Sequence, residues 1–163
     1  MKKVIVIGCP GSGKSVFARE LNKKTGLPLY HLDMIRWRSD RTFISQEQMI
    51  EKIREIVLTD EWIIDGNYGS TMEMRMSYCD TIIFLDYPTE VSFDGIMSRR
   101  GTVRSDLPWV EPVDEIDSEF IEFVLNYNTV NRPVVLERIA KFPDKELHIF
   151  KSREEAGEFL ETL

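Results

Sequence analysis

The chain has 163 residues, of which 42% are hydrophobic and 30% are charged, a composition typical of one globular domain. Its formal net charge of −7 argues against the basic surface of a duplex-binding domain, so direct DNA binding is not expected. No apolar run reaches the length of a membrane span, and Cys9 and Cys79 match no metal or redox spacing. We expect a cytoplasmic protein with a single domain over residues 1–163, present as a monomer or a homodimer.

The first part of the chain predicts strands that alternate with helices. Residues 4–7 form a continuous β-branched run, as in a strand that is buried on both faces of a parallel sheet. A glycine-rich turn follows, and apolar residues on one helical face predict a helix over residues 15–24. Residues 27–32 predict a second short strand. The Ser45-Gln46-Glu47-Gln48 segment reads as a capping box that opens another helix.

The middle of the chain continues this alternation. Residues 62–64 and residues 81–85 are apolar runs that predict two further strands. A helix is expected over residues 89–100. Residues 101–113 contain a glycine, two prolines and mixed charge, and therefore predict a loop.

The last part of the chain begins with its longest periodic segment, residues 115–131, which has Ile116 on its apolar side. Pro133 lacks a backbone N–H, so we expect the helix to stop there and a second short helix to begin. Residues 147–150 predict the last strand, and Ser152 with Glu155 caps a C-terminal helix. The whole pattern predicts a three-layer α/β/α sandwich with a parallel sheet.

Residues 8–15 read Gly-Cys-Pro-Gly-Ser-Gly-Lys-Ser, which fits the phosphate-binding pattern G-x-x-x-x-G-K-[ST] in full. Glycines permit backbone conformations that are closed to other residues, and they bring successive N–H groups toward phosphate oxygens. The helix N-terminus that follows adds donors and a partial positive charge. The motif comes directly after a predicted strand and opens a helix, which is the context that a P-loop requires.

The P-loop predicts a nucleotide site. Lys14 is expected to reach the β- and γ-phosphates, and the Ser15 hydroxyl is expected to bind Mg²⁺. The motif alone does not separate kinases from GTPases or ATPases. The predicted nucleotide-binding residues are Gly8, Pro10, Gly11, Ser12, Gly13, Lys14, Ser15 and Val16.

Motifs beyond the P-loop resemble those of known families. The order of the P-loop, residues 33–36, residues 62–66 and the Arg99-Arg100 pair is similar to the adenylate-kinase superfamily. More closely, the chain resembles the bacterial FlaR-type DNA topology modulation proteins, over nearly its whole length, in His31-Leu32-Asp33, residues 62–68, residues 81–86 and Asn131-Arg132-Pro133. The resemblance implies ATP and Mg²⁺ as cofactors. It also implies a P-loop NTPase fold with a five-stranded parallel sheet of order 2-3-1-4-5 and a short lid at about residues 100–114.

The resemblance assigns a metal role to Asp65, which ends the third predicted strand in an Asp-Gly pair. An aspartate at this position in adenylate kinases orients water on Mg²⁺, so Ser15 and Asp65 are the predicted metal residues. The alternative is a turn residue, because Asp-Gly is common in turns. Asp86, which also ends an apolar strand, ranks second for the metal role.

The segment that begins at Asp33 resembles the acceptor segment of adenylate kinases. There an arginine, here Arg36, contacts the acceptor phosphate, and Trp37 lies between Arg36 and Arg38 in an arrangement suited to a phosphate and a stacked base. The alternative is a pair of surface arginines beside a packed tryptophan. Asp33 is also a candidate to bind an acceptor hydroxyl and act as its base, as in P-loop kinases of small metabolites.

The segment after the Asp-Gly pair departs from typical adenylate kinases. Those enzymes carry an arginine a few residues later, where this chain has Asn67-Tyr68-Gly69-Ser70 and Arg75 as the nearest candidate. This difference weakens the case for AMP as acceptor. The predicted acceptor-binding residues are Asp33, Arg36, Trp37, Asp65, Asn67 and Arg75.

The remaining predicted catalytic residues are arginines. Arg99, Arg100 and Arg104 lie where adenylate-kinase relatives carry lid arginines, and Arg132 follows on the next helix. Mobile arginines supply positive charge to a transferring phosphoryl group. The alternative for the Arg99-Arg100 pair is that it complements a helix dipole. The predicted catalytic set is Lys14, Arg99, Arg104 and Arg132.

The sequence leads to one principal hypothesis about function. It is transfer of the γ-phosphoryl group of ATP to a small acceptor, either a nucleoside monophosphate or a small hydroxyl metabolite. The alternative is a nucleotide-dependent regulator linked to DNA topology, without kinase turnover. A third hypothesis is a slow ATPase with water as its only acceptor.

Overall fold

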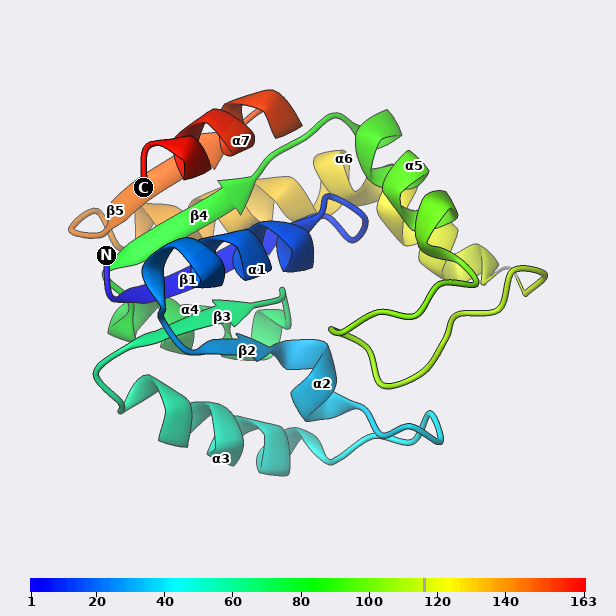
Figure 1. The fold of residues 1–163 in the computed structure, drawn as a ribbon, viewed down its shortest axis with the longest axis horizontal. Helices are drawn as coiled ribbons and strands as arrows, with labels where there is room; N and C mark the ends of the chain where they lie inside the picture. Colours follow the sequence, from blue (N-terminus) through cyan, green and yellow to red (C-terminus); the bar gives the residue numbers. More distant parts are fainter. Residues whose placement is uncertain (116) are drawn as a thin grey trace.

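The computed structural model describes residues 1–115 and 117–163, so Ile116, which was predicted on the apolar side of a helix, lies outside the described residues. Five parallel strands form one sheet in the order β2-β3-β1-β4-β5 (Figure 1). This order confirms the predicted fold. The strands are β1 (Lys3–Gly8), β2 (Leu29–His31), β3 (Trp62–Asp65), β4 (Thr81–Leu85) and β5 (Glu146–Phe150).

Strand β1 lies at the centre of the sheet, paired in parallel with β3 on one side and with β4 on the other. Side chains alternate between the two faces of a strand. Ile5 and Ile7 therefore join the apolar core under one face, and Val4 and Val6 join the core under the other. The β-branched run is buried on both sides, as predicted.

Helices cover both faces of the sheet (Figure 1). Helices α1 and α7 pack on the face to which Val4 points, through side chains such as Phe17 and Ala156. Helices α3, α4 and α6 cover the opposite face, where Met76 and Val135 join the core. No helix in the described part of the chain is both long and apolar enough to cross a membrane. The helices are α1 (Lys14–Thr25), α2 (Leu32–Arg36), α3 (Gln46–Val57), α4 (Gly69–Tyr78), α5 (Thr89–Arg99), α6 (Ser118–Ala140) and α7 (Arg153–Glu161).

Both predicted helix caps are present. The Ser45 side chain accepts a hydrogen bond from the backbone N–H of Gln48, whose side chain accepts from the Ser45 backbone N–H, which completes a capping box. At the start of α7, the Ser152 hydroxyl accepts a hydrogen bond from the backbone N–H of Glu155. The two cap sequences therefore predicted correctly where α3 and α7 begin.

Helix α6 continues through Pro133, so the prediction that this proline ends the helix was wrong. A proline inside a helix removes one backbone hydrogen bond and favours a kink. Here buried side chains hold the helix on both sides of the proline, Val124 and Tyr127 before it and Val135 and Ile139 after it. Tertiary packing therefore outweighs the local cost.

The sequence pattern predicts no helix at α4, yet the structure forms one. The buried side of α4 includes Thr71 and Arg75 as well as Met72 and Met76. Polar residues on the buried side hide the apolar periodicity that identifies an amphipathic helix. The short helix α2 was also missed.

Residues 100–114, which we call the lid, connect α5 to the segment that leads into α6. The described residues of this connection form no helix or strand, as predicted for residues 101–113. The chain runs from the end of α5 toward α2 and then returns to α6 (Figure 1). Asp106 and Leu107 are buried, so the lid is packed against the body of the protein.

Candidate nucleotide and acceptor site

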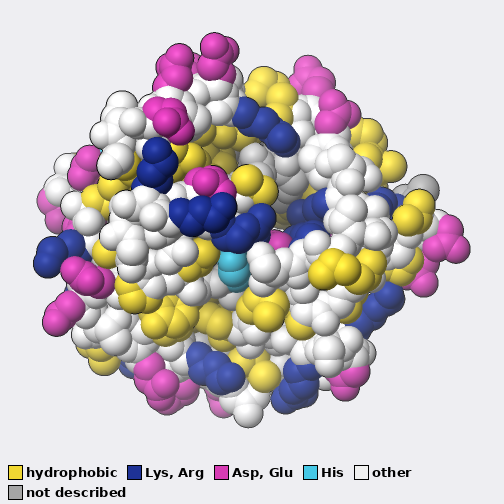
Figure 2. Space-filling view, viewed as in Figure 1, with side chains coloured by type: hydrophobic (Ala, Val, Ile, Leu, Met, Phe, Trp, Pro, Cys, Tyr) yellow, Lys and Arg dark blue, Asp and Glu magenta, His cyan; other side chains and the backbone are white. Residues whose placement is uncertain are grey.

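A cavity of about 780 Å³ lies at the carboxyl ends of β1, β2 and β3 and is bordered by the lid. Parallel α/β sheets bind their ligands at this edge. The P-loop contributes Lys14 and Ser15 to the lining, the segments that follow β2 and end β3 contribute Asp33 and Asp65, and the lid contributes Arg104. Figure 2 views the molecule from the same side as Figure 1 and shows Lys and Arg side chains around a hollow in this face.

The P-loop is shaped by its glycines and by a close contact with α5. Gly11 and Gly13 have φ angles of 84° and 93°, in the left-handed region that favours glycine. A Cβ atom on Gly11 would lie 2.0 Å from the Ser92 backbone oxygen, and a Cβ atom on Gly95 would lie 1.9 Å from the Gly11 oxygen. Gly95, which the motif does not include, therefore permits the loop to rest on α5.

Most of the predicted nucleotide-binding residues line the cavity. Pro10, Gly11, Gly13, Lys14, Ser15 and Val16 do so. Gly8 and Ser12 are buried and do not line it. These two residues therefore belong to the loop without facing the cavity.

Asn67 holds the start of the P-loop against the end of β3. Its side-chain nitrogen donates a hydrogen bond to the Gly8 oxygen at 2.7 Å, and its side-chain oxygen accepts one from the Gly8 N–H at 3.1 Å. The amide thus satisfies both backbone groups of Gly8. Asn67 also borders the cavity, but its polar atoms are used to position the loop.

Lys14 bends back over its own loop. Its ammonium group donates hydrogen bonds to the Gly8 and Cys9 carbonyl oxygens, both at 3.0 Å. Burial lowers the pKa of Lys14, while the negative charge of Asp65 acts in the opposite direction. The two hydrogen bonds hold the ammonium group at the loop, where the motif requires it.

Ser15 contacts a lid residue that sequence reasoning did not single out. Its hydroxyl donates a hydrogen bond to Asp106 at 2.7 Å. Burial acts to raise the pKa of Asp106, but hydrogen bonds from Arg104 and Ser15 outweigh it and hold the pKa well below its usual range. A buried, ionised carboxylate therefore joins the lid to the predicted metal residue of the P-loop.

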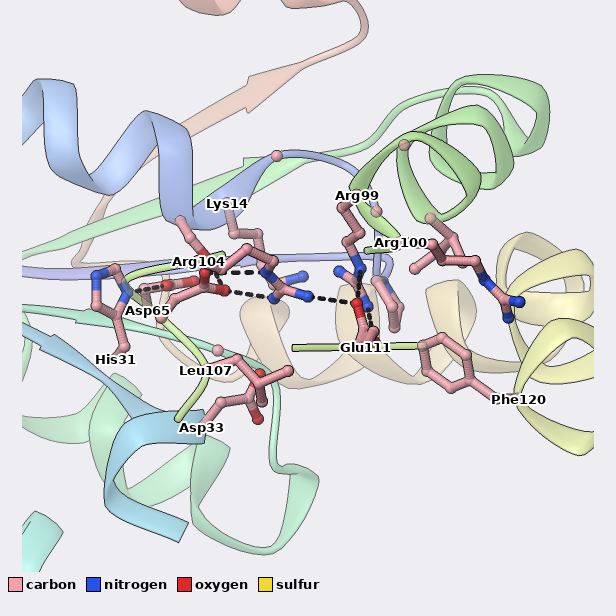
Figure 3. Close-up of a pocket in the computed structure, with 18 of the residues that line it drawn as sticks. Lys14, His31, Asp33, Asp65, Arg99, Arg100, Arg104, Leu107, Glu111 and Phe120 are labelled. Carbon is pink, nitrogen blue, oxygen red and sulfur yellow. Dashed lines mark hydrogen bonds and ion pairs between the residues drawn. The ribbon is translucent and has the colours of Figure 1, made fainter. Parts of the chain in front are cut away.

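The lid arginines are paired with lid carboxylates. Arg104 lies 2.6 Å from Asp106 and 2.7 Å from Glu111, and Arg99 lies 3.0 Å from Glu111. Figure 3 shows Lys14, Arg99 and Arg104 close together, with Arg100 extending to one side of them. The Arg100 guanidinium donates to the Glu115 backbone oxygen. Two of the predicted lid cations therefore lie beside the P-loop lysine.

Asp65 is 4% exposed and contacts His31, the last residue of β2. The distance from His31 Nδ1 to Asp65 Oδ2 is 2.5 Å. The two residues are partners in the parallel register of β2 and β3, so the strand pairing itself brings them together. Sequence reasoning found no partner for His31, because the pairing depends on the register of β2 against β3.

Asp33 lies at the opposite side of the cavity from the P-loop strand, in the first turn of α2. Its carboxylate accepts a hydrogen bond of 2.6 Å from the Tyr68 hydroxyl. Burial raises the pKa of Asp33, although the hydrogen bond from Tyr68 opposes that shift. The side chain is labelled below Leu107 in Figure 3. A carboxyl group with a raised pKa in a cavity is suited to proton transfer.

Trp37 lines the cavity and contacts the lid. Its ring centroid is 4.9 Å from that of Trp109, with an interplanar angle of 74°. It also packs edge-on against Phe43 at 5.2 Å. Edge-to-face aromatic pairs are favourable. The lid is therefore joined to the acceptor segment as well as to the P-loop.

Two predicted acceptor residues point elsewhere. The Arg36 guanidinium lies 4.5 Å from the centroid of the Phe43 ring and donates a hydrogen bond to the Ile44 oxygen. Arg75 is fully buried within α4 and donates to the Gly66 oxygen at 2.9 Å. Neither side chain lines the cavity. Both arginines hold backbone segments that border it.

Arg132 is also placed outside the cavity. Its guanidinium makes two hydrogen bonds to the Asp86 carboxylate, at 2.7 and 2.8 Å, and Lys151 contacts the same carboxylate. Arg132 is thus separate from Lys14, Arg99 and Arg104. The carboxylate of Asp86, the second metal candidate, is bound by two cations. This cluster joins α6 to the ends of β4 and β5.

Comparisons by sequence give a partial match to a known protein. The sequence matches no model of a known protein family. Residues of this chain are 24% identical over 104 positions to the uncharacterized protein YqaC of Bacillus subtilis, a match that spans 60% of this chain and 56% of that protein. The match therefore covers little more than half of either chain.

Two solved structures have a similar fold over almost the whole chain. The shikimate kinase of Bacteroides thetaiotaomicron superposes with a TM-score of 0.59 and 16% identity, covering 98% of this chain and 94% of that one. The shikimate kinase of Aquifex aeolicus gives a TM-score of 0.55 and 16% identity, covering 98% and 92%. The chain therefore has the three-layer fold of P-loop kinases.

Proposed function

We propose that this protein is an ATP-dependent phosphotransferase that transfers the γ-phosphoryl group to a hydroxyl group of a small acceptor. One observation carries the proposal. A complete P-loop and the half-buried carboxyl group of Asp33 border the same cavity, which an arginine-bearing lid closes. The similar fold of the two shikimate kinases supports a kinase reaction. The motifs shared with FlaR-type proteins support membership of that group.

The cationic side chains have a direct role in this reaction. Lys14, Arg99 and Arg104 lie close together at the P-loop, where they would stabilise the charge of the transferring group. Arg99 and Arg104 are already bound to Glu111. We therefore expect the phosphates to compete with lid carboxylates for these arginines. Arg132, held by Asp86, is assigned a supporting role through α6.

The residues present fit a Mg²⁺ ion that the nucleotide helps to hold. The Ser15 hydroxyl and the Asp65 carboxylate are hard oxygen ligands of the kind that Mg²⁺ prefers. Among the described residues no group of three or more His, Cys, Asp or Glu side chains could hold a metal without help. When bound, Mg²⁺ neutralises phosphate charge. Asp106, hydrogen-bonded to Ser15, lies beside this position.

Asp33 is the proposed base. The acceptor hydroxyl would form a new bond to the γ-phosphorus as the bond to the β-phosphate oxygen breaks, and its proton would pass to the Asp33 carboxylate. The Tyr68 hydroxyl donates to one carboxylate oxygen of Asp33 and thereby orients the group. The second carboxylate oxygen is then available to the acceptor hydroxyl. The lid would keep water away from the reacting phosphate.

The proposal is tested by ADP release in the presence of ATP and Mg²⁺, with and without candidate acceptors. We expect ADP release to depend on one class of acceptor and to fall at least a hundredfold in Lys14→Ala. Lys23→Ala, which alters an exposed lysine on the same helix, should leave the rate unchanged. ADP release that is independent of every acceptor would indicate an ATPase, and tight ATP binding with no turnover would indicate a nucleotide-dependent regulator.

A further inference from the structure

The end of the cavity away from the P-loop carries information about the acceptor. We call it the acceptor end and define it by Asp33, Trp37, Tyr68 and Trp109. Kinases that phosphorylate anionic acceptors hold the acceptor's phosphate or carboxylate with arginine or lysine. The positions of the arginines near the acceptor end therefore bear on the charge of the acceptor.

Arg36 is directed away from this end. Its guanidinium stacks over the Phe43 ring at 4.5 Å and also bonds the Ile44 oxygen. A cation over an aromatic face that also donates to a carbonyl is satisfied where it is. Arg38 is exposed and donates to the Thr42 hydroxyl at 3.3 Å. Neither guanidinium borders the cavity.

Arg75 is satisfied in a different way. It is fully buried and donates to backbone oxygens of Gly66, Asn67 and Tyr68. These bonds fix the turn that carries Tyr68. Moving Arg75 toward a ligand would leave three carbonyl groups without this donor, which is unfavourable for buried groups.

The structure describes all of residues 31–44 and 65–78, and Arg41 is the one arginine or lysine in these segments that borders the cavity. It lies 3.4 Å from Glu115, and its side chain is 49% exposed. An exposed arginine that is already paired with a carboxylate adds little positive potential. Residues 31–44 and 65–78 therefore offer no unpaired cation to an anionic group. Arg104 lies on the lid, the segment that carries Trp109, and it is paired with Asp106 and Glu111.

Negative charge and aromatic rings dominate the acceptor end instead. Asp33 lies in it, and Asp65 lines the same cavity. The charge of Asp65 raises the pKa of Asp33 further, while the charge of Lys14 acts in the opposite direction. A phosphate or carboxylate placed here would meet like charges in a partly desolvated space, which is unfavourable. Trp37, Trp109 and Tyr68 form a wall that favours an apolar or cationic group.

We infer that the acceptor is a neutral or cationic hydroxyl compound, without a phosphate or carboxylate group. This inference rests on the proposed function, because it concerns the acceptor of that reaction. It separates this protein from kinases that act on nucleoside monophosphates or on hydroxy acids. The hydroxyl would face Asp33, and the remainder of the acceptor would lie against Trp37 and Trp109.

The inference is tested by binding rather than by turnover. The protein is saturated with Mg²⁺ and a non-hydrolysable ATP analogue, and tryptophan fluorescence is followed during titration with matched compounds. The probes are glucose, glucosamine and gluconate, and thymidine with thymidine 5′-monophosphate. We expect the neutral or amino member of a set to bind at least tenfold more tightly than its anionic counterpart. Trp109→Phe should reduce the signal, because Trp109 lies in the wall.

Asp33→Asn provides the second variant, because it keeps the shape of the side chain and removes its charge. We expect the preference for neutral or cationic probes to fall toward equality in this variant. Equal or tighter binding of the anionic probes by the unaltered protein, or no binding of any probe, would overturn the inference. Failure of the proposed function is read separately, as absence of acceptor-dependent ADP release with hydrolysable ATP.

Discussion

Asp33 combines burial with a hydrogen bond from a tyrosine. Burial disfavours the charged form of the carboxyl group, so its pKa is raised. The Tyr68 hydroxyl offsets part of this shift and fixes the orientation of the group at 2.6 Å. A base of this kind is stronger than an exposed aspartate and is held ready for a hydroxyl.

The raised pKa of Asp33 predicts the pH dependence of the reaction. Transfer requires the ionised carboxylate, so kcat/KM should fall as the pH drops through the pKa of Asp33, above the usual range for an aspartate. The measurement is kcat/KM from about pH 4 to about pH 8, a range that begins near the usual pKa of a carboxyl group and extends well above it. Asp33→Asn should lose at least a hundredfold in rate. An unchanged acid limb in that variant would contradict the assignment.

Asn67 is the second residue whose role follows directly from its contacts. Both atoms of its amide are bonded to Gly8, so Asn67→Ala should leave the Gly8 N–H and carbonyl without these partners. We expect a loss of about 1–3 kcal/mol in the free energy of unfolding, measured by urea denaturation. Asn126→Ala, an exposed position on α6, should change it by less than about 0.5 kcal/mol. Equal losses in the free energy of unfolding for the two variants would show that the hydrogen bonds of Asn67 to Gly8 do not stabilise the protein.

At the scale of elements, the P-loop depends on α5 as well as on its own motif. Gly11 and Gly95 approach so closely that neither has room for a side chain. The eight-residue motif predicts the loop because its geometry is local. It does not predict Gly95, because the contact between loop and helix arises only when the sheet places them together.

The contact between Gly95 and Gly11 predicts opposite effects at two helical glycines. In Gly95→Ala the new methyl group would lie 1.9 Å from the Gly11 oxygen, so the loop must move, and ATP binding should weaken at least tenfold. In Gly157→Ala, on α7, the methyl group would meet no atom within 4 Å. That change should stabilise the protein by about 0.5–1 kcal/mol and leave binding unchanged. Calorimetric titration with ATP and thermal unfolding measure the two effects.

Local and long-range information account for different parts of the fold. Alternating strands and helices predicted the parallel sheet, and the Ser45 capping box predicted the start of α3. The interruption at Pro133 was wrong because the packing of α6 is not visible in the residues beside the proline. Helix α4 was missed because Arg75 lies on its buried side.

The candidate site divides in the same way. The residue types and spacing of the P-loop predicted Lys14 and Ser15, which line the cavity. The direction of Arg36 depends on how the following loop folds Phe43 back beside it, and the direction of Arg132 depends on Asp86, which is distant in the sequence. A long arginine side chain can turn toward whichever partner is near it in the fold, so the position of the residue in the sequence does not determine where its guanidinium group lies.

At the scale of the whole molecule, the lid contacts two regions that are separate in sequence, helix α1 and the segment that carries Trp37. Asp106 bonds Ser15, Ser105 accepts a hydrogen bond of 3.0 Å from Arg19, and Trp109 packs on Trp37. These contacts hold the lid over the cavity. Because Asp106 is bonded by both Ser15 and Arg104, it is the central contact of the closed arrangement.

Removal of the Asp106 charge should therefore loosen the lid. In Asp106→Asn the bonds to Ser15 and Arg104 lose their charge assistance, and trypsin should cleave after Arg100 or Arg104 several times faster than in the unaltered protein. Mass spectrometry of a digestion time course measures this rate. Asp114→Asn, an exposed change in the same segment, should have no effect. Equal cleavage of all three proteins would show that Asp106 does not hold the lid.

The central claim is that the γ-phosphoryl group passes to an acceptor hydroxyl rather than to water. The most direct measurement uses ATP labelled with ¹⁸O in the γ-phosphoryl group, together with Mg²⁺ and a neutral or cationic hydroxyl compound that binds. Mass spectrometry then locates the label. The account predicts labelled phosphate esterified to the acceptor, and its loss in Asp33→Asn. Label found only in inorganic phosphate, at the same rate with and without the acceptor, would contradict it.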